Sequence, residues 1–343
     1  LRNPQWLLGT VTMDAEVASK VTAYLGLLAW GLPASLFYRT FYAFCNALGK
    51  PRVLMGIGLG ALTLHALLAW GLALQGWAGE PLGVIGCGLS NIIIAWLACL
   101  GGAAYLAFGP LGKRYRPFAD WAAPDARRWR ELLHLGLPMG LSNLVEITSF
   151  TLISLFIASL GATVVAGHRI VANISALTYM LPLSLAIATM AAVGQAVGGR
   201  DWARAHAAIK AGLLLAAMLS TLVGLLLWLA AAPLIAAYTD DPAVRAVAGG
   251  LIIYVALYQF FDALQTVAGH ALRAYRVTFV PMLVQTFCFW GVGLLGGSWL
   301  CYRWSPPLGV AGFWLASVIS LVLAAAMLLP LLRKAMQATE SPP

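Results

Sequence analysis

Residues 132–159 read LLHLGLPMGLSNLVEITSFTLISLFIAS, an apolar stretch with a single carboxylate, Glu146. A helix needs roughly 20 apolar residues to cross the hydrocarbon core of a bilayer, so this stretch predicts a membrane-spanning helix. The whole chain is 61% hydrophobic and 10% charged, whereas a soluble domain has about 25% charged residues. We therefore predict an all-α integral membrane protein whose immediate surroundings are the lipid bilayer.

Eight further stretches have the length and apolar character of spans, which makes nine in the chain. They are 21–45, 53–76, 84–108, 163–195, 207–231, 244–268, 278–300 and 308–332. The two longest spans, 132–159 and 163–195, contain Pro138 and Pro182, where we expect kinks or breaks because proline removes a helical hydrogen bond.

The net charge of +9 is better explained by topology than by a nucleic-acid partner. Lys and Arg gather in alternate connections, most densely in 109–130, and are sparse in the others. Cytoplasmic loops of membrane proteins carry this excess of basic residues. We therefore expect 109–130 and the C-terminus to be cytoplasmic, and we expect no nucleic acid to bind.

The chain partly repeats itself. Residues 81–86 read PLGVIG and residues 307–312 read PLGVAG, and weaker matches precede both at nearly the same offset, among them Asp14 with Asp241. Each copy holds three spans and both run in the same direction, as in transporters built from two similar halves. The block 130–240 has no counterpart, so we expect about 95 residues before Leu1 and twelve helices in two six-helix lobes.

This reading divides the chain into four parts. Residues 1–110 hold the last three helices of an N-terminal lobe, 111–130 form a cytoplasmic linker between lobes, 131–335 form the C-terminal six-helix lobe, and 336–343 form a cytoplasmic tail.

Only two carboxylates lie inside spans, Glu146 and Asp262. An acid at the centre of a bilayer costs about 3 kcal/mol, so its presence calls for a functional reason. Burial disfavours the charged form of a carboxylate. Such a group either takes up a proton or holds a cation, and the sequence leaves both possibilities open.

Polar residues accompany both acids. Ser142, Asn143 and Ser149 share a helical face with Glu146, and the two serines are typical of contacts between membrane helices. Tyr258 lies one turn before Asp262, and its phenol oxygen, like the carboxylates, suits a hard cation such as Na⁺. We expect both acids to open onto one shared aqueous chamber.

The next span begins with His168 and Arg169. Arg169 either neutralises one of the two acids or extends to the membrane surface. Asn173 lies one turn further along and shares its face. Among the aromatic residues of the spans, we expect Phe150, Phe156, Tyr179, Tyr254 and Phe261 to be candidates for a cavity wall.

Several of these segments resemble one family. The run 136–150, GLPMGLSNLVEITSF, resembles the seventh helix of the multidrug and toxic compound extrusion (MATE) family. Residues 166–173 and 181–184 resemble its eighth helix, 193–198 the following turn, and 258–265 its tenth helix. The resemblance runs the length of the chain and is closest to the bacterial NorM-like branch.

The resemblance implies a MATE-type bundle, lacking the first three of its twelve helices, that exports drugs in exchange for inward Na⁺ or H⁺. It also implies that Glu146, Tyr258 and Asp262 form the cation site of the second lobe. We expect the drug to be bound around the same place, by Asn143, Glu146, Arg169, Asn173, Tyr258 and Asp262.

The resulting hypothesis is a monomeric antiporter of the bacterial inner membrane that exchanges Na⁺ or H⁺ for amphipathic, often cationic drugs and needs no cofactor. A second reading, a flippase for lipid-linked precursors, requires a strongly basic cavity, and only Arg39 and Arg169 lie within spans. A third reading, a membrane-embedded enzyme acting on lipid, requires clustered His, Asp or Cys residues near one membrane face, and the sequence offers no such cluster.

Overall fold

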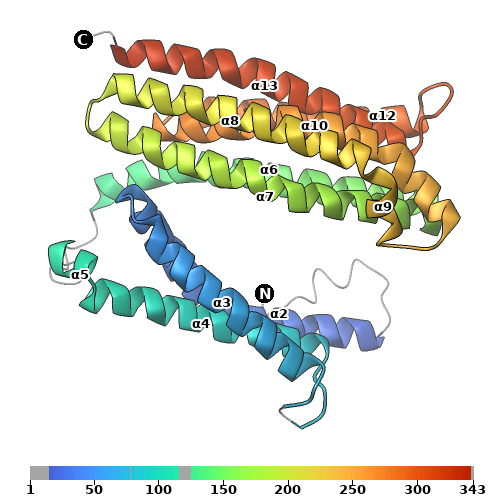
Figure 1. Ribbon diagram of the computed structural model, residues 1–343, viewed down its shortest axis with the longest axis horizontal. Helices are drawn as coiled ribbons and strands as arrows, with labels where there is room; N and C mark the ends of the chain where they lie inside the picture. Colours follow the sequence, from blue (N-terminus) through green and yellow to red (C-terminus); the bar gives the residue numbers. More distant parts are fainter. Residues whose placement is uncertain (1–14, 78, 116–124, 341–343) are drawn as a thin grey trace. The chain divides into compact units, whose positions relative to one another are not determined.

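The computed structural model describes residues 15–77, 79–115 and 125–340. The predicted all-α membrane fold is confirmed, because nine helical segments of these residues are long and apolar enough to cross a bilayer (Figure 1). Residues 1–14, 116–124 and 341–343 lie outside the described residues. They include Asp14, much of the predicted linker and the end of the predicted tail.

The chain divides into two compact units, Leu1–Ala123 and Pro124–Pro343. The first unit contains the helices α2 (Ala15–Ala47), α3 (Pro51–Ala73), α4 (Val84–Phe108) and the short α5 (Pro110–Tyr115). Helix α4 packs against both α2 and α3. A small apolar core, which includes Phe41, Leu54 and Leu106, joins the three helices.

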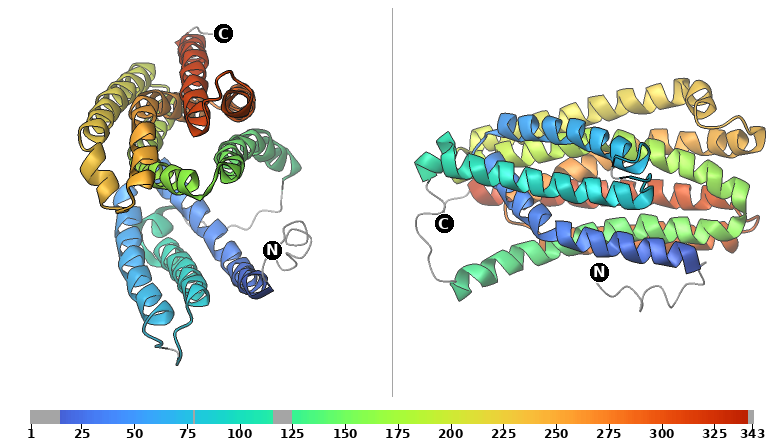
Figure 2. Two further views of the ribbon diagram at one scale, coloured as in Figure 1. Left: turned by 90° about the vertical axis from the view of Figure 1, so that its right-hand side faces the viewer. Right: turned by 90° about the horizontal axis from the view of Figure 1, so that it is seen from below.

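The second unit is a larger bundle. Its helices are α6 (Ala126–Ile157), η1 (Ala158–Leu160), α7 (Ala162–Gly198), α8 (Trp202–Leu229), α9 (Ala231–Ala236), α10 (Pro242–Ala274), α11 (Phe279–Thr286), η2 (Phe287–Gly296), α12 (Gly297–Tyr302) and α13 (Val310–Glu340). Helix α10 packs against α7, α8 and α13 and is therefore the central helix of this unit (Figure 2).

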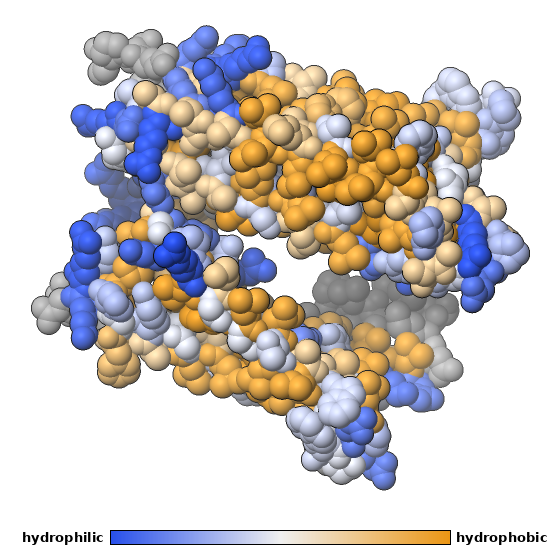
Figure 3. Space-filling model, viewed as in Figure 1, coloured by the Kyte–Doolittle hydropathy of each residue, from blue (hydrophilic) through white to orange (hydrophobic). Residues whose placement is uncertain are grey.

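Many of the large side chains on the outside of the helices are apolar. On α8 alone, Leu214, Met218, Leu222 and Trp228 are each more than half exposed. On the face of each unit shown in Figure 3, hydrophobic residues cover the middle of the helices and hydrophilic residues lie toward the helix ends. Lipid is as apolar as these side chains, so this surface fits a bilayer.

The two copies of the sequence repeat share features just before a helix begins, although the connections that contain them, 74–83 and 303–309, differ in length. Gly83 and Gly309 both have positive φ, 53° and 58°, which glycine adopts without steric cost. The residue before each glycine donates its backbone N–H to the preceding helix: Leu82 to Leu72 O at 3.1 Å, and Leu308 to Leu300 O at 3.2 Å. The repeated PLGV motif therefore ends both connections with a backbone hydrogen bond to the preceding helix and a glycine at positive φ.

Both copies also bring two helices into close contact three residues later. A Cβ atom added to Gly86 would lie 2.8 Å from the backbone of Ala73, and one added to Gly312 would lie 2.8 Å from the backbone N of Cys301. Glycine at these two positions permits backbones to approach as in other membrane bundles.

Two features differ from expectation. Helices α6 and α7 continue through Pro138 and Pro182 and are not broken there, as neighbouring helices permit in membranes. The span 278–300 contains a π-helical segment, η2, that its sequence did not predict. Ser149 Oγ donates to Phe289 O at 3.1 Å, and Ser320 Oγ donates to Cys288 O at 2.7 Å. Ser149 therefore joins helices as predicted, and both hydroxyls hydrogen-bond carbonyls of the π-helical segment.

Candidate cation and drug site

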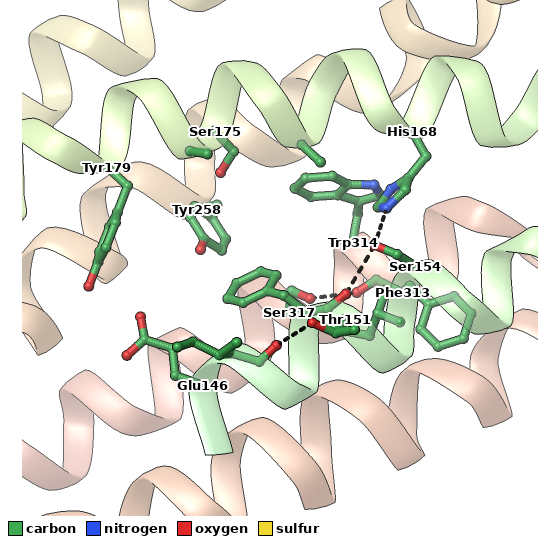
Figure 4. A pocket seen from close by; sticks show the side chains of 15 residues that line it. Glu146, Thr151, Ser154, His168, Ser175, Tyr179, Tyr258, Phe313, Trp314 and Ser317 are labelled. Atoms are coloured by element: carbon green, nitrogen blue, oxygen red, sulfur yellow. Dashed lines mark hydrogen bonds between the residues drawn. The ribbon is translucent and has the colours of Figure 1, made fainter. Parts of the chain in front are cut away.

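A cavity of about 350 Å³ lies inside the second unit, between α6, α7, α10 and α13 (Figure 4). Aromatic and small apolar side chains form most of its wall, with a few polar groups among them. The lining residues are Glu146, Ile147, Phe150, Thr151, Ile153, Ser154, His168, Ala172, Ser175, Ala176, Tyr179, Tyr258, Phe313, Trp314 and Ser317.

The cavity lies between the two arms of a helical hairpin. Helix α6 is followed by η1 and by Gly161, whose φ of 102° allows the chain to reverse into α7. Helix α6 packs mainly on α11 and η2 and makes few contacts with α7. The space between these two arms is closed at the back by Tyr258 of α10 and Trp314 of α13.

Glu146 is the carboxylate on this wall. It is half-buried. Its side chain lies at one end of the cavity and faces the side chain of Tyr179 at that same end (Figure 4). The Tyr179 hydroxyl lies within electrostatic range of both Glu146 and Asp262. Arg273, near the end of α10, also lies within electrostatic range of Glu146.

Asp262 lies deeper in the protein and is only 2% exposed. It is one helical turn from Tyr258, which does line the cavity, and it is within electrostatic range of Glu146. The expectation that both acids open onto one aqueous chamber is therefore wrong for Asp262 in this structure. The two acids are close enough to influence one another, but only Glu146 lines the cavity.

A buried amide holds one oxygen of Asp262. Gln265 Nε2 donates to Asp262 Oδ1 at 3.1 Å and to Thr266 Oγ1 at 3.0 Å, and Gln265 Oε1 accepts from Gln285 Nε2 at 3.5 Å. Asp262 Oδ2 has no hydrogen-bond partner among the described residues. This oxygen is therefore left available to bind a cation or a proton.

The other predicted site residues lie elsewhere. Asn143 is exposed and does not line the cavity, although Glu146 follows it by three residues. Arg169 is also exposed, beside the lining residue His168. Asn173 is exposed and accepts a hydrogen bond of 2.9 Å from the Tyr238 hydroxyl. The structure thus brings Glu146, Tyr258 and Asp262 together. Asn143, Arg169 and Asn173 lie away from the cavity.

Part of the remaining cavity wall was predicted from the sequence. Phe150 and Tyr179 were expected on a cavity wall and are found there, whereas the other three aromatic candidates, Phe156, Tyr254 and Phe261, do not line this cavity. Trp314 and the roles of His168 and Gln265 were missed. A buried glutamine one turn after an intramembrane acid was a usable signal for Gln265, since polar side chains inside a membrane protein seek partners.

The wall favours a flat apolar molecule with a positive charge. Phe150 and Tyr258 pack edge to face at 6.4 Å between ring centres, as do Tyr258 and Trp314. Aromatic faces and a carboxylate both attract cations. The pyrophosphate of a lipid-linked precursor would be repelled by Glu146, so the charge on the wall argues against the flippase reading.

Comparison with known proteins places the chain in a family. The family model MatE matches residues 1–70 and 138–299. The chain is 51% identical over 338 residues to a protein named probable multidrug resistance protein NorM from Aromatoleum aromaticum, which covers 97% of this chain and 73% of the relative. It is 35% identical over 325 residues to the multidrug resistance protein PmpM of Pseudomonas aeruginosa. This match covers 94% of this chain and 68% of the relative.

Solved structures agree on the fold. The structure is similar to that of an outward-facing multidrug resistance MATE family transporter, with a TM-score of 0.87 and 17% identity over 98% of this chain and 74% of the other. It is also similar to the eukaryotic MATE transporter AtDTX14, with a TM-score of 0.83 and 18% identity. This match covers 98% of this chain and 76% of the other. The chain belongs to the MATE family and is therefore a multi-pass membrane transporter, not an enzyme.

Proposed function

We propose that the protein is a secondary active multidrug efflux transporter that exchanges Na⁺ or H⁺ for amphipathic, often cationic drugs across the bacterial inner membrane. The names of its relatives, which are multidrug resistance proteins, support drugs as the transported molecules. In this proposal the protein is a monomer with a cytoplasmic C-terminus. Residues 131–335 act as the C-terminal lobe, and the transported ion is the sole inorganic requirement.

One observation is central to the proposal: a carboxylate, Glu146, lies on the wall of an aromatic cavity of about 350 Å³ and within electrostatic range of a second, buried acid, Asp262. A drug cation in the cavity and a coupling ion would both be attracted by Glu146. Since two positive charges near one carboxylate repel each other, binding of the ion weakens binding of the drug.

The coupling ion has three residues with candidate oxygen ligands, Glu146, Tyr258 and Asp262. Asp262 Oδ2 is without a hydrogen-bond partner among the described residues, and Tyr258 lies one turn earlier on the same helix. Carboxylate and phenol oxygens suit a hard cation such as Na⁺. A proton would instead bind to one of the two carboxylates. Asn143, Arg169 and Asn173, which lie away from the cavity, remain proposed drug contacts for other conformations of the transporter.

The ion gradient can drive this exchange. Moving one elementary charge through 100 mV releases about 2.3 kcal/mol. Each 1.4 kcal/mol corresponds to a tenfold concentration ratio, so this energy supports a drug gradient of roughly 50-fold.

The test is ethidium efflux from vesicles that contain the protein, with an imposed Na⁺ or H⁺ gradient. Glu146→Gln and Asp262→Asn each remove one negative charge and keep the size of the side chain, and each is expected to abolish gradient-driven efflux. Glu131→Gln is the matched control. Glu131 also lies on α6, but it is exposed and pairs with Arg276 at 2.8 Å. Gradient-driven efflux that persists in both test variants would refute the proposal.

A further inference from the structure

The cavity has a second polar end, away from Glu146. His168 of α7 and Ser154 of α6 meet there, with His168 Nε2 at 3.2 Å from Ser154 Oγ. The His168 ring lies against the indole of Trp314, 5.7 Å between ring centres and tilted by 58°. Figure 4 shows these three side chains at the end of the cavity opposite Glu146 and Tyr179.

The hydrogen-bonding capacity of this end is only partly used. Ser154 Oγ donates to Phe150 O at 3.0 Å. In its contact with His168 it therefore accepts a hydrogen bond from Nε2–H. His168 Nδ1 and Trp314 Nε1 are buried and have no hydrogen-bond partner among the described residues. Each such group costs about 1–3 kcal/mol when it stays unpaired. His168 and Trp314 are each only 5% exposed, and both line the cavity.

The spacing of the two polar ends follows from helix geometry. Glu146 and Ser154 lie on the same straight run of α6, eight residues apart. At 1.5 Å per residue they are separated by about 12 Å along the helix axis. Phe150 lies midway between them, and its ring packs edge to face against Tyr258. The wall between the two ends is therefore aromatic.

We propose that His168, Ser154 and Trp314 form a second recognition point for the transported molecule. The substrate class that fits both ends is an elongated aromatic cation that bears a neutral hydroxyl or amide group about 12 Å from its charge. The charge lies at Glu146, the flat body lies against the aromatic wall, and the neutral group hydrogen-bonds at the far end. This inference rests on the proposed function, because it assigns the other end of the proposed drug cavity.

A matched pair of fluorescent probes tests the proposal. The first probe is N-methyl-4-[4-(hydroxymethyl)styryl]pyridinium, and the second carries an ethyl group in place of the hydroxymethyl group. The two have the same charge and nearly the same size, and only the first can hydrogen-bond at its far end. The measurement is the ratio of their dissociation constants for the protein in detergent micelles.

In Ser154→Ala and in His168→Phe, the preference for the hydroxymethyl probe is expected to fall about 3- to 10-fold relative to the unaltered protein, as loss of one hydrogen bond predicts. The affinity for the ethyl probe stays within about twofold in Ser154→Ala, because this probe makes no hydrogen bond there. Ser159→Ala is the control, since Ser159 of η1 also donates to a nearby carbonyl of α6, Phe156 O at 2.8 Å, but does not line the cavity.

An unchanged ratio in Ser154→Ala would overturn the proposal, as would an equal fall in Ser159→Ala. Glu146→Gln separates this proposal from the proposed function. It is expected to weaken both probes alike and to leave their ratio unchanged. If Glu146→Gln altered neither affinity, the proposed function would fail, whereas the ratio measured in Ser154→Ala would still decide the role of the far end.

Discussion

Replacing the glycine at the repeated helix contact is expected to destabilise the protein at both copies of the repeat. In Gly312→Ala the new methyl group would lie 2.8 Å from Cys301 N and 2.9 Å from Leu300 C, and in Gly86→Ala it would meet the backbone of Ala73 at the same distance. Backbone atoms of a packed helix cannot move aside as the end of a flexible side chain can. Overpacking of this kind costs about 1–3 kcal/mol.

Gly101→Ala is the matched control. Gly101 lies on α4, as Gly86 does, but a Cβ atom there would have no neighbouring heavy atom within 4 Å. Alanine is favoured over glycine inside a helix by about 1 kcal/mol, so this variant is expected to be slightly stabilised.

The assay is thermal unfolding in detergent, followed by circular dichroism. The test variants and the control are expected to differ by about 1–3 kcal/mol, the overpacking cost, because the helix preference for alanine acts in all three variants. With a shift of about 2 °C for each kcal/mol, the midpoints should differ by several degrees. Equal midpoints for Gly312→Ala and Gly101→Ala would show that the helix contact inferred from the repeat is not close-packed.

The remaining predictions concern buried hydrogen bonds and one surface ion pair. Ser320→Ala removes the hydrogen bond to Cys288 O in the π-helical segment and should lower the free energy of unfolding by about 0.5–1.5 kcal/mol. The control is Ser298→Ala, which should have little effect in the same unfolding assay, because Ser298 Oγ donates to Leu295 O, three residues earlier. Gln265→Leu leaves Asp262 Oδ1 without its donor and should cost about 1–3 kcal/mol. Adding Asp262→Leu should restore part of this loss, because it removes the carboxylate oxygen that Gln265→Leu leaves without a donor, and failure to recover any of it would contradict the network. Glu131→Gln breaks an exposed ion pair and should change stability by less than about 1 kcal/mol.

The fold was largely predictable because its determinants are local. Apolar length identified the nine spans, and the PLGV motif marked the start of a helix in two places, with Gly83 and Gly309 both at positive φ. The π-helical segment could not be predicted in this way. Its carbonyls are bonded by Ser149 and Ser320, which are distant in sequence from η2.

The candidate site was predictable in its acids and less so in its surroundings. A carboxylate inside a span is rare enough to mark a site on its own. The orientation of neighbouring side chains depends on how each helix is rotated about its axis by tertiary packing. For this reason Asn143 and Arg169 are exposed, although each is close in sequence to a residue on the cavity wall.

Tertiary packing also decides how deeply a side chain is buried, and the sequence alone does not predict this depth. Tyr258 and Asp262 are one helical turn apart, yet Tyr258 lines the cavity and Asp262 is enclosed. The enclosing residue Gln265 and its partner Gln285 come from two helices, α10 and α11. Such a contact depends on which helices are neighbours, and a single sequence does not specify this.

Competition between ion and drug at Glu146 can be measured directly as ethidium binding to the purified protein while Na⁺ or H⁺ is raised at constant ionic strength. We predict that one of the two ions weakens ethidium binding to the unaltered protein, and that Glu146→Gln binds ethidium more weakly and no longer responds to that ion. Ethidium binding that is insensitive to both ions in the unaltered protein, or an ion effect that persists undiminished in Glu146→Gln, would contradict the account.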